Sequence, residues 1–174
     1  MPPRVLDAGA STGGFTQVLL EAGAERVYAV DVGHDQLVPV LRDDPRVVVR
    51  ERLNLRDLTL ADLEDERVDL VVGDVSFISL KLLLEPLFAV LRPRGEALLL
   101  VKPQFEVGRA GLDDRGVVRD EALRERAVAG IVEAAATLGR QPAWQGESGL
   151  PGESGNREYF VHFVPGTSAV GGGR

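Results

Sequence analysis

The chain has 174 residues, 27 of them acidic and 20 Lys or Arg, with 44% hydrophobic residues and a formal net charge of −7. This size predicts one domain with a buried core, and the acidic balance argues against a protein that holds nucleic acid unaided, which needs a basic face. The absence of cysteine excludes disulfides and thiolate metal sites, and the two histidines, His34 and His162, argue against a histidine zinc site.

Neither a membrane span nor a signal peptide is indicated. No apolar run approaches the roughly eighteen residues that cross a bilayer. The start, Met1-Pro2-Pro3-Arg4, lacks the basic and apolar regions of a signal peptide. We therefore expect a cytoplasmic protein.

Short apolar runs alternate with helical patterns over the first two thirds of the chain. The predicted strands, buried on both faces, are 5–6, 27–30, 47–49, 68–72 and 97–101. The predicted helices are 15–22, closed by Gly23, then 35–41, and 79–91, ended by Pro93 and Gly95. This alternation predicts right-handed βαβ crossovers and a parallel sheet with helices on both faces.

The last third follows a different pattern. Residues 103–120 show little periodicity and predict a long loop, a kind of segment that is often functional. Residues 121–138 predict an amphipathic helix ended by Gly139. Strand patterns at 143–147 and 158–164 predict a terminal hairpin that adds an antiparallel strand to the sheet. We expect one domain over 1–164 and a disordered tail over 165–174.

A glycine-rich turn follows the first predicted strand, in the sequence VLDAGASTGGF at 5–15, and Asp31 ends the second strand roughly twenty residues later. Dinucleotide-type βαβ sites have this arrangement, because glycine lets the backbone approach a ligand and the acid can accept both ribose hydroxyls. Pyrophosphate-binding turns read G-x-G-x-x-G, whereas here Gly9 is followed only by Gly13 and Gly14. The spacing favours S-adenosylmethionine (SAM) over NAD; NAD and a bare structural turn are the alternatives.

Ligands of open α/β sheets bind beyond the carboxyl ends of the strands, so polar residues at those ends are candidates. Asp74 follows the fourth strand, Lys102 ends the fifth and Glu158 lies at the last. Lys102 is one of two lysines in the chain, and lysine, unlike arginine, can lose its proton when desolvated. It could orient or deprotonate a hydroxyl as a methyl group arrives. The alternatives are a structural Lys102–Asp74 ion pair, helix capping by Asp74 and a solvent-facing Glu158.

The same strand ends supply the predicted cofactor and RNA contacts. Asn54 can pair with the adenine edge, and Leu55 could pack on the adenine face. The predicted cofactor-binding residues are Asp7, Gly9, Ala10, Ser11, Thr12, Gly13, Phe15, Asp31, Val32, Asn54, Leu55 and Asp74. In the long loop, Arg109, Arg115 and Arg119 are candidates for contacting RNA phosphates or for closing over the site.

Five motifs stand out: LDAGASTGGFT at 6–16, YAVDVG at 28–33, DVSFIS at 74–79, VKPQFE at 101–106 and GNREYF at 155–160. With them the chain resembles the TlyA-type, hemolysin A-like ribosomal RNA ribose methyltransferases of the FtsJ-like superfamily, over nearly everything from Val5 to about Phe163. The resemblance implies a Rossmann-like class I SAM-dependent methyltransferase fold. Its sheet would be seven-stranded and mostly parallel, with an antiparallel terminal strand. It also implies SAM as cofactor and ribosomal RNA, or a ribosomal subunit, as partner.

The resemblance further implies a Lys-Asp-Lys-Glu tetrad acting on a ribose 2′-hydroxyl, and its last three members fall on Asp74, Lys102 and Glu158. The first lysine and an S4-like RNA-binding domain lie upstream of the glycine turn in the family. Neither has a counterpart here, so we expect a domain cut from a longer parent. Two alternatives stay open: a SAM-binding domain inactive on its own, and an NAD-linked oxidoreductase. No segment predicts the membrane-lytic activity that the name hemolysin suggests.

Overall fold

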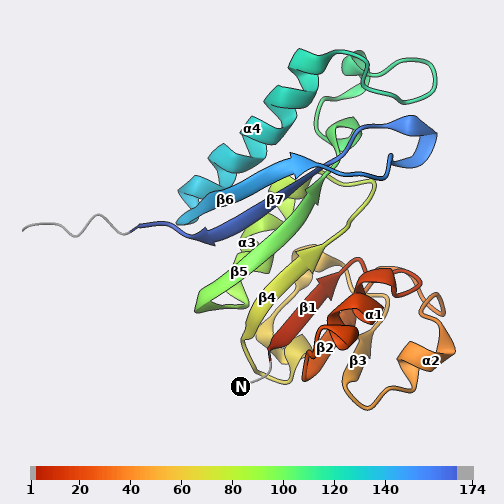
Figure 1. Cartoon of the computed structure of the whole chain (residues 1–174), viewed down its shortest axis with the longest axis vertical. Helices are drawn as coiled ribbons and strands as arrows, with labels where there is room; N and C mark the ends of the chain where they lie inside the picture. The colour runs from red at the N-terminus through yellow and green to blue at the C-terminus, as the bar shows by residue number, and fades with distance from the viewer. Residues whose placement is uncertain (1–2, 168–174) are drawn as a thin grey trace, which may run out of the picture.

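The computed structural model describes residues 3–167, and within them seven strands form one sheet in the order β3-β2-β1-β4-β5-β7-β6 (Figure 1). The strands are β1 (Arg4–Ala8), β2 (Arg26–Val30), β3 (Val47–Arg50), β4 (Val68–Gly73), β5 (Leu91–Val101), β6 (Arg140–Glu147) and β7 (Tyr159–Pro165). Strands β1 to β5 pair in parallel, and β7 is antiparallel to both β5 and β6. The structure confirms the mostly parallel sheet and its antiparallel terminal hairpin.

Helices lie on both faces of this sheet. Over residues 3–167 the α-helices are α1 (Gly14–Glu21), α2 (Pro39–Arg42), α3 (Leu84–Ala89) and α4 (Glu121–Thr137). Short 3₁₀ turns fill several connections: η1 (Leu55–Asp57), η2 (Leu60–Leu63), η3 (Leu80–Leu82), η4 (Pro103–Phe105), η5 (Arg109–Gly111) and η6 (Glu153–Gly155). The predicted first and last helices are confirmed as α1 and α4.

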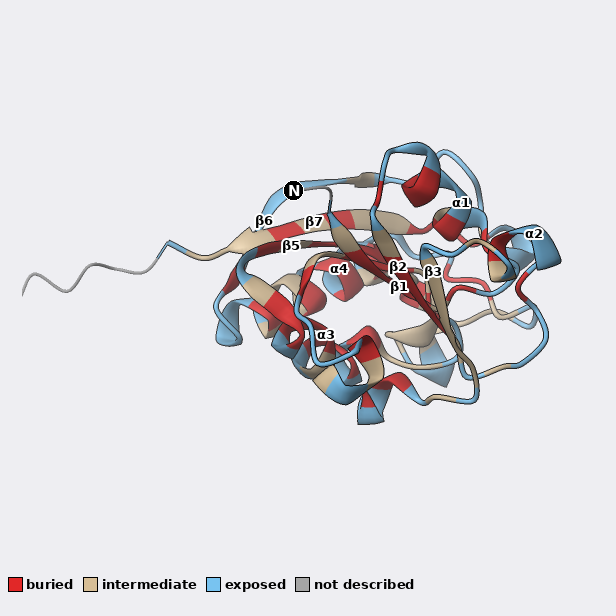
Figure 2. Cartoon of the chain, turned by 90° about the horizontal axis from the view of Figure 1, so that it is seen from below, coloured by how far each residue is buried: buried red, intermediate tan, exposed pale blue. Residues whose placement is uncertain are grey.

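Two clusters of buried side chains hold the layers together. Leu6 of β1 packs in the larger cluster with residues of α3 and α4, whereas Val5 packs in the smaller cluster with Leu19 of α1. Successive side chains of β1 therefore face opposite helix layers, and both are buried. This explains why the parallel strands read as continuous apolar runs. Figure 2 shows β1 and β2 largely buried and the edge strand β3 only partly buried.

Two helix predictions are corrected by the structure. The helix predicted over 35–41 shrinks to α2, because Asp35 has a φ of 54° and Pro39 opens the helix. The helix predicted over 79–91 divides into η3 and α3, and β5 already begins at Leu91. The β4–β5 register jumps from Val68↔Leu91 to Leu70↔Glu96. Residues 92–95 are therefore outside the ladder, where a proline without an N–H is tolerated.

The terminal hairpin is longer than predicted. Strand β6 begins at Arg140, which pairs with Pro165 of β7. Pro165 is therefore a strand residue, which corrects its assignment to the tail, and the remaining tail positions 168–174 lie outside the described residues.

Candidate active site

The turn between β1 and α1 is pressed against the end of β4. Gly9 has a φ of 85°, and a Cβ there would lie 2.4 Å from the Asp74 carbonyl oxygen. The amides of Gly9 and Ala10 both donate to the Val30 carbonyl, at 2.9 and 3.0 Å. Only glycine fits at position 9, because both the backbone angle and the space exclude a side chain.

Asp31 connects this turn to the end of β2. Its Oδ2 accepts from the Ser11 amide at 2.8 Å and its Oδ1 from the Gly33 amide at 2.7 Å. A carboxylate has about four acceptor positions, so Asp31 can accept further hydrogen bonds from a ligand. The predicted pairing of the glycine turn with Asp31 is therefore present in the structure.

Two adjoining hollows open at the carboxyl ends of β1, β2 and β4. Their volumes are about 500 and 390 Å³, and Gly9, Ser11 and Asp74 border both. The larger is lined by Gly9, Ser11, Asp31, Val32, Gly33, Gln36, Leu53, Leu55, Asp74, Val75, Ser76, Phe77, Ile78, Leu83 and Glu153. The smaller is lined by Gly9, Ala10, Ser11, Thr12, Gly14, Phe15, Val18 and Asp74. Both hollows lie against the glycine turn, and Asp31 lines the larger one whereas Phe15 lines the smaller.

Asp7 lies completely buried at the end of β1. Thr16 Oγ1 donates to its Oδ2 at 2.7 Å, whereas Oδ1 has no hydrogen-bond partner among the described residues. Burial raises the pKa of the Asp7 carboxyl to about 6, despite the opposing hydrogen bond from Thr16. Asp7 borders neither hollow, so its contact with a cofactor stays a prediction.

Lys102 meets Asp74 and Ser76 at the end of β5. Its Nζ donates to Ser76 Oγ at 2.8 Å and lies 2.7 Å from Asp74 Oδ1, a charge contact without hydrogen-bond geometry. The Lys102 side chain is 12% exposed and that of Asp74 36%. The ammonium is therefore largely desolvated, and its carboxylate partner opens into both hollows.

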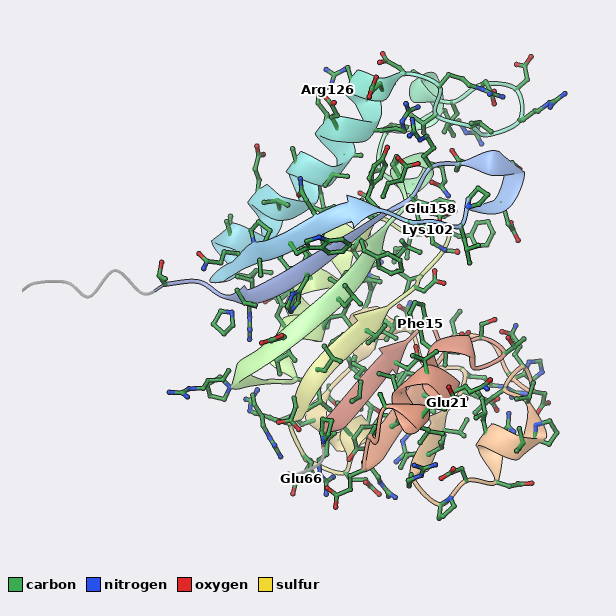
Figure 3. The ribbon with its side chains drawn as sticks, in the orientation of Figure 1. Phe15, Glu21, Glu66, Lys102, Arg126 and Glu158 are labelled. Atoms are coloured by element: carbon green, nitrogen blue, oxygen red, sulfur yellow. The ribbon has the colours of Figure 1, made fainter. Side chains whose placement is uncertain are left out.

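Glu158 directly precedes β7 and is only 6% exposed, which excludes the solvent-facing alternative. Gln104 Nε2 donates to its Oε1 at 2.8 Å, and the backbone of Gly152 packs so closely that a Cβ there would lie 2.1 Å from the same oxygen. The register pairs Val101 with Tyr159, so Lys102 and Glu158 lie at the same end of neighbouring strands (Figure 3). The three residues predicted for catalysis thus converge on one edge of the sheet.

Asn54 does not reach the hollows. Its side chain is exposed, and its Oδ1 accepts from the Arg56 amide at 3.0 Å and so caps η1. The pairing of Asn54 with the adenine edge therefore stays a prediction that the lining of the hollows does not support. Leu55 does line the larger hollow, as predicted, and Leu53, which the sequence reasoning missed, lies beside it.

The loop after Asp74 also supplies lining residues that were not predicted. Phe77 is 85% exposed at the rim, with a φ of 64° and its ring centroid 5.3 Å from that of Phe105. A non-glycine residue in this backbone region is strained, and such strain clusters at functional sites. The DVSFIS motif could have indicated the loop, but not the exposure of its aromatic ring.

The three loop arginines lie outside the hollows. Arg109, Arg115 and Arg119 are exposed, and Arg119 donates to Asp113 Oδ2 at 2.7 Å. The pKa of the Asp113 carboxyl is lowered to about 2 by hydrogen bonds from the Val117 amide, the Arg119 side chain and the Arg115 amide. Asp113 therefore organises the tip of this loop, and the arginines form its solvent-facing surface.

Neither a metal cluster nor a membrane span is found in residues 3–167. That part of the chain holds no group of three or more His, Cys, Asp or Glu side chains suited to a metal ion. It also contains no helix long and apolar enough to cross a membrane.

A family model described as FtsJ-like methyltransferase matches residues 3–164. The chain belongs to the FtsJ-like methyltransferase family. TlyA of Mycobacterium tuberculosis, named a 16S/23S rRNA (cytidine-2′-O)-methyltransferase, is 52% identical over 158 residues, which cover 91% of this chain and 59% of TlyA. The FtsJ-like chain described here thus spans about three fifths of that curated relative's length.

Solved structures agree with the family assignment. A Lactococcus lactis protein described as a hemolysin has a TM-score of 0.90 at 43% identity, covering 93% of this chain and 77% of that one. A Listeria monocytogenes protein described as a SAM-dependent methyltransferase has a TM-score of 0.69 at 16% identity, covering 94% and 91%, and shares the fold. The Rossmann-like methyltransferase fold is confirmed, and the NAD-linked oxidoreductase is not favoured for a member of the FtsJ-like family.

Proposed function

We propose that this FtsJ-like domain transfers the methyl group of SAM to a ribose 2′-hydroxyl of ribosomal RNA in the cytoplasm, with a ribosomal RNA or subunit as its partner. The observation that carries the proposal is the convergence of Lys102, Asp74 and Glu158 beside the hollows of the glycine turn. The 52% identity to TlyA, whose name gives cytidine-2′-O-methylation of rRNA, supports the substrate.

The residues of the two hollows fit SAM. The turn backbone approaches closely enough to bind the methionine part, and Asp7, outside the hollows, is proposed to accept from its amino group through the unpartnered oxygen. Asp31 can accept from the ribose hydroxyls, while Val32, Leu53 and Leu55 offer apolar surface to the adenine. The remaining residues proposed for binding are Gly9, Ala10, Ser11, Thr12, Gly13, Phe15 and Asp74. When bound, SAM supplies a methyl group on a positively charged sulfur, activated for attack by an oxygen.

Lys102 performs the acid–base part of the proposed reaction. The Lys102 side chain is largely buried, and its Nζ can orient the 2′-hydroxyl. In its neutral amine form Lys102 accepts the hydroxyl proton as the 2′-oxygen bonds to the methyl carbon and the carbon–sulfur bond breaks. The Asp74 carboxylate lies 2.7 Å from Nζ and holds the amine in place, and Glu158 is proposed as the third member of the catalytic group, at the same end of the neighbouring strand. Holding the acceptor oxygen in line with the methyl carbon supplies much of the acceleration.

The rim of the site suits an unstacked nucleotide. Taking a base out of its stack costs about a few kcal/mol, and stacking on an aromatic ring returns about 1–3 kcal/mol. The exposed ring of Phe77 offers such a surface beside Asp74 and Ser76. We propose that Arg109, Arg115 and Arg119 contact the RNA phosphates, which compensates locally for the acidic chain.

The substitution Lys102→Ala tests the proposal, with Lys81→Ala as a matched control because these are the only lysines in the chain. Removing a general base lowers turnover by about a hundredfold to ten-thousandfold. Methylation of ribosomal RNA by Lys102→Ala should fall in this range, while SAM affinity measured by calorimetry stays within about twofold. Lys81→Ala should retain both properties, and normal turnover by Lys102→Ala would remove Lys102 from the mechanism.

A second measurement separates the enzyme from a binding module. The chain is assayed alone and joined to the upstream region of a TlyA-type relative. SAM binding without methyl transfer in both forms would favour a SAM-binding domain that does no chemistry.

A further inference from the structure

Glu106 connects the two loops that carry the proposed catalytic groups. Its Oε2 accepts from Ser79 Oγ at 2.6 Å, and its Oε1 accepts from the Leu80 amide at 2.7 Å. Glu106 belongs to the loop that follows β5, four residues after Lys102, whereas Ser79 ends the loop that follows β4. The two hydrogen bonds therefore join segments 26 and 27 residues apart in the chain.

The loop that Glu106 reaches contains a strained residue and is bound at both ends. Phe77 lies in the left-handed region, with a φ of 64°. At the start of the loop the Asp74 amide donates to the Ala8 carbonyl at 3.0 Å. At its other end Ser79 and Leu80 are bound by Glu106, and Ser79 Oγ accepts from the Lys81 amide at 3.3 Å.

Asp74 and Ser76, the two residues that contact the Lys102 ammonium, lie between these anchors. Loss of the Glu106 hydrogen bonds would leave this end of the loop held by the buried side chain of Leu80 alone. Glu106 itself borders neither hollow and contacts neither Lys102 nor Asp74 through a hydrogen bond in residues 3–167. Its effect on the site is therefore indirect.

We propose that Glu106 is a positioning residue: through Ser79 and Leu80 it holds Asp74 and Ser76 against Lys102. The role of this arrangement in methyl transfer rests on the proposed function. The hydrogen bonds, rather than the negative charge, carry the effect. A glutamine at position 106 keeps an acceptor for the Leu80 amide and an amide group that can bond to the Ser79 hydroxyl.

Lysine NMR tests the arrangement without requiring enzyme activity. With lysine labelled at Cε with ¹³C, the chain gives two Cε signals, from Lys81 and Lys102, and Lys81→Arg assigns them. We expect Glu106→Ala and Ser79→Ala to shift or broaden the Lys102 signal, and Glu106→Gln to restore it. Glu133→Ala, which changes an exposed glutamate on α4, should leave it unchanged. Far-UV circular dichroism confirms that each variant is folded.

Turnover measurements then test the consequence for the reaction. Misplacement by about 1 Å can cost a hundredfold in rate, so we expect Glu106→Ala to lower kcat by about tenfold to a hundredfold. Glu106→Gln should stay within about threefold of the unsubstituted chain.

The outcomes separate the positioning role from the proposed function. If both Ser79→Ala and Glu106→Ala fold and leave the Lys102 signal unchanged, the positioning role is overturned. If Glu106→Ala does not fold, the Lys102 signal of Ser79→Ala alone decides the question. A changed Lys102 signal together with normal kcat also overturns it. If the Lys102 signal moves but the unsubstituted chain methylates no ribosomal RNA, the coupling of the two loops stands and the proposed function fails.

Discussion

Asp7 should make the folded chain less stable near neutral pH than an uncharged residue at the same place. The pKa of its carboxyl rises from 3.8 to about 6 in the folded chain, mainly because the group is buried. Between these values the folded state holds the proton that the unfolded chain has already released. The free energy of unfolding therefore falls as the pH rises through this interval.

The size of the effect follows from the two pKa values. Each unit of difference corresponds to about 1.4 kcal/mol, so the penalty reaches about 3 kcal/mol at about pH 7.5 and about half of that at about pH 5. Asp7→Asn removes the titrating group at nearly constant volume, and its amide oxygen can still accept from Thr16 Oγ1. The variant should therefore gain stability over the unsubstituted chain as the pH is raised.

Urea unfolding without cofactor, followed by far-UV circular dichroism, measures this gain at both pH values. The other carboxylates titrate alike in the two proteins, so the difference between the proteins isolates Asp7. Asp57→Asn, an exposed aspartate in η1, serves as the control and should show no such trend. If Asp7→Asn differed from the unsubstituted chain by the same free energy of unfolding at about pH 5 and at about pH 7.5, the burial argument would be refuted. Because the carboxylate is proposed to bind the amino group of SAM, the same variant should bind SAM more weakly.

Three further substitutions test other parts of the structure. Gly9→Ala places a Cβ 2.4 Å from the Asp74 carbonyl oxygen at a φ of 85°. It should lower the urea midpoint, at a cost in stability of at least about 1–2 kcal/mol, and abolish SAM binding. Retained SAM binding would contradict the close approach of the backbone to the ligand. Asn156→Ala removes the bonds to the Gly116 carbonyl and the Val118 amide and should destabilise the fold by about 1–3 kcal/mol, so an unchanged Tm would count against it. Phe77→Ala should change stability by less than about 0.5 kcal/mol yet reduce methylation of RNA; full methylation would show that the exposed ring does not serve the substrate.

Local patterns predicted the elements whose signal is contained within a short stretch of chain. The apolar runs of β1, β2 and β4 are buried on both faces, so the prediction needed no knowledge of their partners. The start of β5 was missed because Pro93 and Gly95 normally end a helix or strand. A register shift against β4 accommodates both residues, and that shift depends on the neighbouring strand.

The same distinction applies to the site. Asp7, Gly9 and Asp31 were predicted from spacing, because the turn and the strand that follows it lie close in the chain. The burial of Glu158 was not predicted, because a glutamate at a strand end is more often exposed. Its partner Gln104 is 54 residues away in sequence, and the contact exists because β7 lies beside β5.

The amino-acid order by itself therefore determined the alternation of strands and helices, the glycine turn and the charged residues at strand ends, since each depends on neighbours within a few residues. Only the tertiary structure decided that Lys102 meets Asp74 and Ser76, that Glu158 is buried beside them, and that Asn54 caps η1 rather than facing the hollow. These contacts depend on strand order, register and loop packing, which bring together groups that no local repeat relates.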